Sequence, residues 1–277
     1  MMRKSVHSDI VKNIKEFNGF SKDCYILLQQ KFKNVDEGTL FSILSHEYQK
    51  RMKLLHVKTS NVINKYFNSY EEAINRREDP GIILRIALEA NISPCLVAKL
   101  ILQKYYDDVE SDNESINVNK YIRDTTLIKN TDLAYEVFLC TLYDDQYSPA
   151  IETMRSSIGQ QYEILLHKQM TNLGIAFRDE EYLRKFGYDK TPDFKLEVPI
   201  AIDGFIIHWI ESKALFGDED VHKDYIRHQY SSYWNRFGPG LVIYWFGYLE
   251  TIVQLSEKRF IVRDKLSENF VTIVKQI

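Results

Sequence analysis

The sequence predicts an α+β protein, with an all-helical N-terminal half and a C-terminal half built on a mixed β-sheet flanked by helices. Up to about residue 145, apolar residues recur at the three- and four-residue spacing of amphipathic helices. After one further long helix, short apolar runs alternate with helical segments, as expected of a sheet covered by helices. We therefore predict a helical domain over residues 1–145 and a sheet domain over residues 146–277.

Helical spacing is clearest in "GTLFSILSHEYQKRMKLL" and "TSNVINKYFNSYEEAI". In the following apolar segment, one helix is predicted to end near Ala90. Ser93 and Pro94 are then typical of an N-cap and a first helical residue, so they open a second helix. Two short helices joined by a tight turn form the helix-turn-helix pattern, which occurs in DNA-binding proteins and in helical proteins without that role.

The second helix of this pair offers few groups for reading bases. The positions expected to face solvent are Lys99, Gln103 and Lys104. The acidic stretch "DDVESDNES", residues 107–115, predicts an exposed loop after this helix.

The C-terminal half predicts an alternation of helices and strands. The expected elements are a helix over 149–172, a strand over 175–179, a helical turn over 180–187, strands over 193–198 and 205–215, a helix over 220–237, and strands over 241–246 and 259–264. The run "LVIYWF" is apolar throughout, which predicts a strand buried on both faces.

Composition bounds the possible partners. The chain has 277 residues, 44% of them apolar, and a net charge of −3, so it is not a polycation. Residues 1–70 nevertheless contain 12 Lys and Arg against 6 Asp and Glu, a local net charge of +6. This excess is expected either of a surface that contacts a polyanion or of an ordinary solvated helical surface.

The cysteines predict a reducing compartment. Cys24, Cys95 and Cys140 are odd in number and form no C-x-x-C pair, which argues against a disulfide framework and a zinc finger. The N-terminal segment lacks the apolar stretch of a signal peptide, and no segment approaches the length of a membrane-spanning helix. We expect a soluble, intracellular protein that does not bind membranes.

The strand "FIIHWIESKAL" carries an unusual pair of charges. Because alternate residues of a strand share a face, Glu211 and Lys213 lie on the same face as Ile207 and Trp209. A charge in such surroundings is unfavourable unless it is paired or bound to a metal. Asp193 heads the preceding strand, and two strands joined by a short connection are expected to be antiparallel neighbours. The three charged side chains should therefore meet.

Two converging carboxylates form a site for a hard divalent cation, Mg²⁺ or Mn²⁺, which prefers oxygen ligands. The carbonyl oxygen of Ser212 is a candidate third ligand beside Asp193 and Glu211. A cation there would activate water and neutralise charge on a scissile phosphate, and Lys213 would orient the water or stabilise charge at phosphorus.

The turn between the two strands sets a condition on this site. A two-residue Asp203-Gly204 turn would pair Ile202 with Phe205, and an unbroken ladder would then leave Asp193 and Glu211 on opposite faces of the sheet. The site requires a shift of the register by an odd number of residues. We predict such a shift through a bulge near Pro199 or through a three-residue loop.

The pattern Pro-Asp, a gap, then Glu-x-Lys resembles the signature of the PD-(D/E)XK nuclease superfamily. That resemblance implies an additional metal-site carboxylate, for which Glu163 in the helix before the sheet is the candidate. Gln229 and Tyr233 give the Q-x-x-x-Y spacing, which resembles the motif that lines the active site in the RecB-like branch. The plainer alternatives are an exposed residue at position 163 and a helix face packed on the sheet at positions 229 and 233.

Longer blocks are similar to one family within this superfamily. "GYDKTPDF", "HWIESKA" and "YWNRFGPGLVIYW" resemble the codanin-interacting nucleases of animals, over nearly the whole chain. The resemblance implies helix-turn-helix modules followed by a PD-(D/E)XK domain, a nuclear and cytoplasmic location, association with codanin, and a role in chromatin biology and erythroid differentiation.

Two functions remain open on the sequence. The first is a metal-dependent DNA phosphodiesterase, and the second is a nuclease fold that holds codanin or nucleic acid with little turnover. If DNA spans both halves, we expect the basic residues Lys50, Arg51, Lys53 and Lys58 to lie on the same side of the molecule as Asp193.

Overall fold

The computed structural model describes residues 1–55, 59–109, 117–255 and 259–272. The chain divides into two compact units, each of which is discontinuous in sequence. The sheet unit comprises residues 1–10, 34–42 and 156–277, and the helical unit comprises residues 11–33 and 43–155. This division assigns residues 1–10 and 34–42 to the sheet unit, whereas the predicted domains place them in the helical half.

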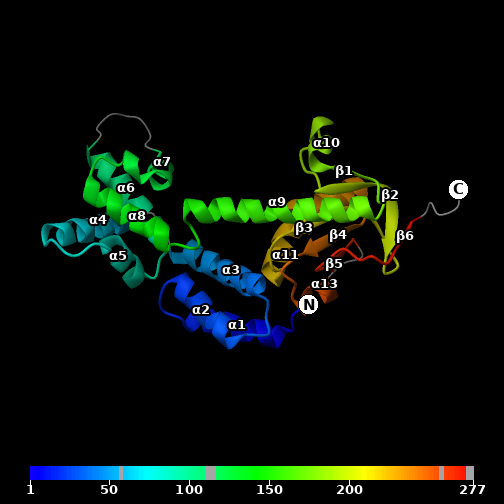
Figure 1. The fold of residues 1–277 in the computed structure, drawn as a ribbon, viewed down its shortest axis with the longest axis horizontal. Helices are drawn as coiled ribbons and strands as arrows, with labels where there is room; N and C mark the ends of the chain where they lie inside the picture. Colours follow the sequence, from blue (N-terminus) through cyan, green and yellow to red (C-terminus); the bar gives the residue numbers. More distant parts are fainter. Residues whose placement is uncertain (56–58, 110–116, 256–258, 273–277) are drawn as a thin grey trace. The chain divides into compact units, whose positions relative to one another are not determined.

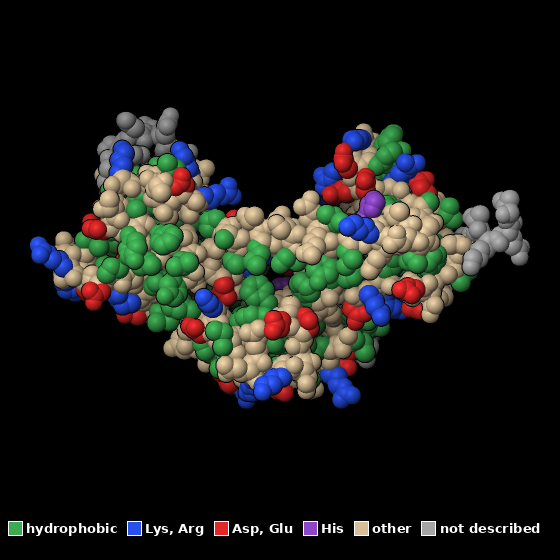
Figure 2. Space-filling model, in the orientation of Figure 1, with side chains coloured by type: hydrophobic (Ala, Val, Ile, Leu, Met, Phe, Trp, Pro, Cys, Tyr) green, Lys and Arg blue, Asp and Glu red, His purple; other side chains and the backbone are tan. Residues whose placement is uncertain are grey.

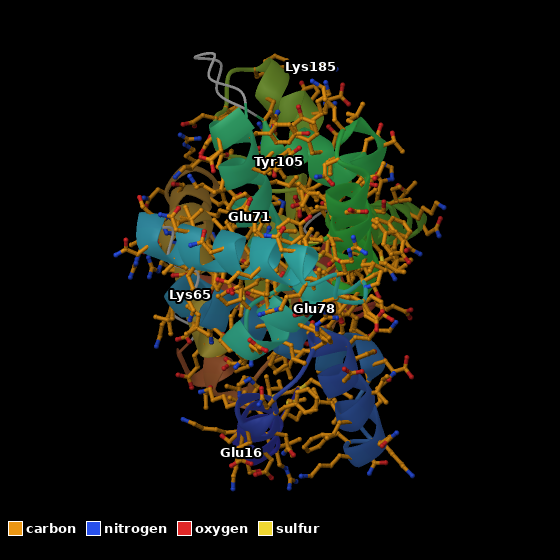
Figure 3. The ribbon with its side chains drawn as sticks, turned by 90° about the vertical axis from the view of Figure 1, so that its left-hand side faces the viewer. Glu16, Lys65, Glu71, Glu78, Tyr105 and Lys185 are labelled. Atoms are coloured by element: carbon orange, nitrogen blue, oxygen red, sulfur yellow. The ribbon has the colours of Figure 1, made fainter. Side chains whose placement is uncertain are left out.

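Helices make up the N-terminal part of the chain, as predicted (Figure 1). They are α1 (Lys4–Glu16), α2 (Ser21–Lys31), α3 (Glu37–Leu55), α4 (Ser60–Asn75), α5 (Ile82–Ala90), α6 (Pro94–Val109), α7 (Val118–Arg123), the 3-10 turn η1 (Thr125–Leu127) and α8 (Thr131–Tyr143). Figure 3 shows α4, with Lys65 and Glu71 labelled, crossing α6, which carries Tyr105. Buried side chains of α4, α5, α6 and α8 form the core of the helical unit.

As the sequence predicts, α5 ends at Ala90 and α6 begins at Pro94. The two helices are bent by 116° relative to each other. That angle is typical of a helix-turn-helix. However, α6 contributes seven buried residues to the core: Cys95, Val97, Ala98, Leu100, Ile101, Leu102 and Tyr106. It is the central helix of the unit, and little of its surface is left to enter a DNA groove.

Two of the three polar side chains predicted for the exposed face of α6 form hydrogen bonds within the helix. Gln103 Nε2 donates to Asp107 Oδ1 at 2.7 Å, and Lys104 Nζ donates to Asp108 Oδ1 at 2.5 Å. Such pairs one turn apart stabilise the end of a helix. They explain why residues 107–109 are helical rather than part of the predicted acidic loop, whose remainder lies outside the described residues.

Among the described residues, no single helix is long and apolar enough to cross a membrane. The pair of α5 and α6 meets the length and composition criteria only when the two bent helices are taken together.

The sheet unit contains one mixed sheet with strand order β1-β2-β3-β4-β5 and with β6 paired to β2. Pairings of β2 with β1, β3 and β6 are antiparallel, and β3, β4 and β5 run parallel. The strands are β1 (Phe177–Asp179), β2 (Phe194–Ile202), β3 (Phe205–Lys213), β4 (Gly240–Tyr244), β5 (Phe260–Arg263) and β6 (Phe270–Thr272). All five residues of β4 are buried, which confirms that this apolar strand is covered on both faces.

The helices of the C-terminal part are α9 (Pro149–Asn172), α10 (Glu180–Lys185), α11 (Glu219–Tyr225), the π-helix η2 (Ile226–Tyr230), α12 (Ser231–Phe237) and α13 (Glu250–Leu255). The bounds of α9 agree with the prediction. Its C-terminal part packs on the sheet, where Leu166 and Met170 join Phe194, Ile210 and Leu241 in the core. The single helix predicted over 220–237 is wrong in detail, because a π-helical turn separates α11 from α12. The short elements α13 and β6 have too few residues to show a periodic pattern.

The predicted register shift between β2 and β3 is confirmed. Asp203 and Gly204 both have positive φ angles, of 51° and 80°, as a two-residue type I′ turn requires. Beside this turn Ile202 pairs with Phe205, but further along Phe194 pairs with Ile210, a shift of three residues between Lys195 and Ile200. The irregular segment contains Pro199, which has no N–H to donate to the ladder.

Candidate active site

The register shift brings Asp193 beside Glu211. Since Phe194 pairs with Ile210, the residue before Phe194 lies opposite the residue after Ile210. The main-chain N–H of Asp193 donates to Glu211 Oε2 at 3.2 Å, and Asp193 Oδ2 accepts the N–H of Ser212 at 2.7 Å. These two hydrogen bonds tie the start of β2 to the end of β3 and hold both carboxylates at one place.

Lys213 completes the cluster. Its Nζ lies 2.6 Å from Glu211 Oε1, with the two side chains 16% and 2% exposed. The ammonium also lies over the ring of Tyr225, 4.8 Å from the ring centroid, which is a favourable cation–π position. The charge pair recognised in the strand sequence is therefore a buried ion pair.

The environment changes the protonation of all three groups. Burial raises the pKa of Glu211, and the neighbouring Asp193 raises it further. Burial also raises the pKa of Asp193, while Lys213 and the Ser212 N–H oppose the shift. For Lys213, burial alone would lower the pKa, but Glu211 and Asp193 outweigh it and the pKa is raised. The two carboxylates thus favour the protonated form of Lys213.

A pocket of about 540 Å³ opens beside Asp193. Glu163 of α9 and Glu180 of α10 line it together with Asp193. Burial raises the pKa of Glu163, and Asp193 and Glu180 are the next causes, so the three carboxylates lie within electrostatic reach of one another. Glu163 therefore lines the same pocket as Asp193, and its part in binding a metal stays a prediction.

Gln229 and Tyr233 are separated by the end of the π-helix η2. Tyr233 is buried and packs edge-on against Trp209, with the ring centroids 5.3 Å apart. Burial raises its pKa, and Glu211 and Asp193 contribute, which places Tyr233 near the carboxylates. Gln229 Oε1 is buried and has no hydrogen-bond partner in the described part of the chain. π-Helical turns are often found at functional sites.

Two neighbours of the cluster are not indicated by the sequence motifs. Glu180 accepts a hydrogen bond from Thr191 Oγ1 at 3.1 Å, which ties α10 to the residues before Asp193. Tyr225 covers the ammonium of Lys213. The acidic first turn of α10 was a weak signal for the former. No spacing rule relates Tyr225 to Lys213, because only the packing of α11 on β3 brings them together.

The cluster offers few oxygen donors for a hard divalent cation. Within the described residues, no group of three His, Cys, Asp or Glu side chains is arranged to hold a metal. The available oxygens come from Asp193, whose Oδ1 accepts no hydrogen bond from the described residues, and from Glu211. Mg²⁺ commonly keeps several waters and takes only one or two protein carboxylates together with substrate phosphates, so the donor set fits Mg²⁺ or Mn²⁺. The orientation of the Ser212 carbonyl toward this point stays a prediction.

Fold and site together define an α+β protein with a buried carboxylate–carboxylate–lysine cluster at the edge of an acidic pocket. A family model described as "Protein of unknown function TPD sequence-motif" matches residues 129–266, a range that includes Thr191-Pro192-Asp193. The chain belongs to the family of CDAN1-interacting nuclease 1 proteins.

Relatives of that name are similar over most of their length. The chain is 40% identical to the Xenopus tropicalis protein over 256 residues, which cover 91% of this chain and 84% of that protein. It is 40% identical to the Homo sapiens protein over 253 residues, 90% of each chain. It is 39% identical to the Mus musculus protein over 249 residues, 89% of each chain. No solved structure matches this chain.

Proposed function

We propose that the protein is a divalent-metal-dependent nuclease of the PD-(D/E)XK type that hydrolyses phosphodiester bonds in DNA. The observation that carries this proposal is the convergence of Asp193, Glu211 and Lys213 on one face of the sheet. The register shift between β2 and β3 produces this convergence, and a regular hairpin would not contain such a shift. The word nuclease in the relatives' name supports the same chemistry.

Asp193 and Glu211 would hold Mg²⁺ or Mn²⁺, which would neutralise charge on the scissile phosphate and make its attack by water easier. Lys213 would act as a cation rather than as a base, because its ion pair with Glu211 favours the protonated form. It would offset the negative charge that develops on the non-bridging oxygens at phosphorus. Glu163 and Glu180 would hold waters at the outer side of the pocket.

The site also has features expected of a protein that binds a metal. Burial and the nearby Asp193 raise the pKa of Glu211 to about 8, so ionising both carboxylates beside a single ammonium is unfavourable, and a bound cation would favour their ionised forms. Substituting buried ionic groups by apolar side chains of similar size often costs little stability, so a buried carboxylate pair is better explained by metal binding than by stability.

The direct test uses the purified full chain with Mg²⁺ or Mn²⁺ on labelled flaps, forks, four-way junctions and linear duplexes, with RNA counterparts. The Lys213→Ala variant should lose cleavage. The matched control is Lys223→Ala, which removes an exposed lysine of α11 and should cleave like the wild type. Equal cleavage by the two variants would show that the activity does not arise at this cluster.

A second candidate function is protein docking, with codanin as the occupant. The observation that favours it is the outer face of α8, where Tyr135, Phe138, Leu142 and Tyr143 are exposed. The helix contains no Lys or Arg, and a helix that is apolar on its outer face as well as its inner face is expected to be covered. Figure 2 shows hydrophobic side chains gathered over this part of the helical unit. The relatives are named for their interaction with CDAN1.

This candidate is tested with purified codanin by isothermal titration calorimetry. The double variant Phe138→Glu/Leu142→Glu should bind codanin at least tenfold more weakly, because two charges would enter an apolar interface. The control Leu54→Glu changes an exposed apolar residue on α3, which is more exposed than Phe138 and Leu142. If the double variant binds as tightly as the control, α8 is not the docking face.

A further inference from the structure

The helix α10 and the loop after it present aromatic rings to solvent. Phe186 is 65% exposed, Tyr188 is 40% exposed and Tyr182 is 37% exposed. The rings of Tyr182 and Phe186 lie 4.7 Å apart. Single exposed apolar residues are ordinary, but three large rings within seven residues form a patch of the kind that contacts a ligand.

This patch adjoins the candidate active site. The first turn of α10 lines the pocket through Glu180 and Glu181, together with Asp193. Since an α-helix rises about 1.5 Å per residue, Phe186 lies on the order of 9 Å along the helix axis from Glu180. A chain of nucleotides with one phosphate at Asp193 is therefore long enough to reach the rings within one or two nucleotides.

Basic side chains are interleaved with the rings. The guanidinium of Arg178 lies 4.4 Å from the ring centroid of Tyr182. Arg184 and Lys185 are exposed in the last turn of α10, and Arg236 pairs with Asp189 beside Tyr188. Figure 2 shows acidic, basic and hydrophobic side chains side by side over α10, and Figure 3 labels Lys185 at the top of the view.

The charges on α10 are sorted along its axis. Glu180 and Glu181 occupy the first turn at the pocket, and Arg184 and Lys185 pair with them one turn later, at 2.7 and 2.8 Å. Both ion pairs are exposed, and exposed pairs are weak, so either cation can exchange its carboxylate for a phosphate. Cations for the backbone and rings for the bases are the combination that single-stranded nucleic acid binds.

The contrast with α8 favours nucleic acid over protein at this patch. The exposed rings of α8 lie on a helix without a single Lys or Arg, which suits an apolar protein interface. The patch on α10 has Arg178 over the ring of Tyr182, and Arg184 and Lys185 lie on the same helix in exposed ion pairs. An apolar partner would have to desolvate these charges, whereas a phosphodiester chain can take the place of their carboxylates.

We propose that Tyr182, Phe186 and Tyr188 form a stacking subsite for unpaired nucleotides, with Arg184 and Lys185 contacting their phosphates. The subsite rests on the proposed nuclease function and specifies its substrate class, namely nucleic acid with a single-stranded segment at the point of cleavage. Fully paired duplex cannot use it, because its bases are already stacked on each other.

The test measures binding in the full-length Lys213→Ala background, in which cleavage does not interfere. Fluorescence anisotropy compares a single strand, a flap and a blunt duplex of related sequence. The double variant Phe186→Ala/Tyr188→Ala should weaken binding of the single strand and the flap about tenfold or more, and of the duplex less than about twofold. The control Ile206→Ala removes an exposed apolar residue of β3 and should change none of them. The single variant Phe186→Trp keeps an aromatic ring at this position and should bind the single strand as tightly as the parent protein.

Two results would overturn the subsite: equal single-strand binding by the double variant and the control, or equal losses for the single strand and the duplex. If the double variant still binds oligonucleotides but no longer binds purified codanin, the patch is a protein-docking surface. The nuclease proposal fails separately. If the wild type cleaves no substrate with either cation but the ring variants still lose single-strand binding, the subsite stands and the catalytic role does not.

Discussion

Among the residues of the cluster, Asp193 is the most direct candidate for a metal ligand. One of its oxygens accepts the Ser212 N–H at 2.7 Å, and the carboxylate lines the pocket. Asp193→Asn keeps the shape but removes the negative charge. We expect the affinity for Mn²⁺ to fall more than tenfold, because hard cations depend on charged oxygen ligands. The measurement is the shift of the thermal unfolding midpoint with increasing Mn²⁺.

The control for that measurement is Glu197→Gln, which neutralises an exposed carboxylate on the same strand, β2. An equal Mn²⁺-dependent shift in Asp193→Asn and in this control would place the cation elsewhere.

His222 is a buried group outside the cluster whose protonation affects stability. It is 2% exposed, its Nδ1 lies 2.9 Å from the hydroxyl of Tyr244, and its Nε2 has no partner among the described residues. Burial lowers the pKa of His222 from 6.5 to about 4. The folded state therefore favours the neutral ring. The resulting stability is present above pH 6.5 and is lost as the pH falls from 6.5 toward 4.

His222→Phe should remove this dependence. Between pH 6.5 and 4 the wild type should lose about 3 kcal/mol more of its free energy of unfolding than the variant, as a pKa shift of this size requires. Denaturant unfolding at a series of pH values measures the difference. Parallel curves for the two proteins would contradict the buried neutral histidine.

At the scale of elements, α8 supplies the caps for the helix pair α5 and α6. Glu136 accepts the N–H groups of Gly81 and Ile83, at 2.7 and 2.9 Å. Asp144, which follows α8, accepts the N–H of Cys95 at 2.9 Å and the hydroxyl of Ser93. The predicted N-cap residue Ser93 thus donates to a carboxylate that performs the capping.

Glu136→Ala should destabilise the protein by about 2–3 kcal/mol, because two buried N–H groups would lose a charged acceptor. Chemical denaturation gives the free energy of unfolding. The control Glu89→Ala removes an exposed carboxylate of α5 and should stay within about 0.5 kcal/mol of the wild type. A similar small change for Glu136→Ala would mean that the α5 N-terminus is satisfied by other groups.

The sequence predicts the register shift because chemistry restricts geometry there: two carboxylates needed for one cation must share a face. The helix bounds are predictable where caps are local, as at Ser93 and Pro94. Contacts between segments that are distant in sequence cannot be predicted from local patterns, and most of the features that the sequence did not indicate are contacts of this kind. Glu136 caps a helix 53 residues away, and Tyr225 meets Lys213 only through packing. The π-helical turn at Ile226–Tyr230 leaves no trace in apolar spacing.

At the scale of the whole molecule, positive charge is concentrated in the N-terminal part, where residues 1–70 contain 12 Lys and Arg against 6 Asp and Glu. Lys50, Arg51 and Lys53 belong to the helical unit and Asp193 to the sheet unit, and Lys58 lies outside the described residues, so their common side stays a prediction. Lys50 pairs with Glu47 at 3.0 Å, and the Arg51 guanidinium lies 4.5 Å from the Tyr48 ring. Lys53 is exposed.

Replacing all four basic residues by Glu should weaken DNA binding and reduce the slope of log K against log salt by about 2–4, as the loss of phosphate contacts requires. Anisotropy titrations at several salt concentrations provide the slope. Unchanged affinity and slope would assign the helical unit to protein docking.

We propose that the cluster of Asp193, Glu211 and Lys213 cleaves phosphodiester bonds with a divalent cation. The most direct test is the single-turnover cleavage rate of Glu211→Gln on a labelled flap in Mg²⁺, with DNA affinity measured on the same preparation. The variant removes a ligand charge and a carboxylate that repels phosphate. Cleavage should fall more than about 100-fold while affinity is unchanged or raised. Full cleavage by Glu211→Gln would contradict the assignment of the activity to this site.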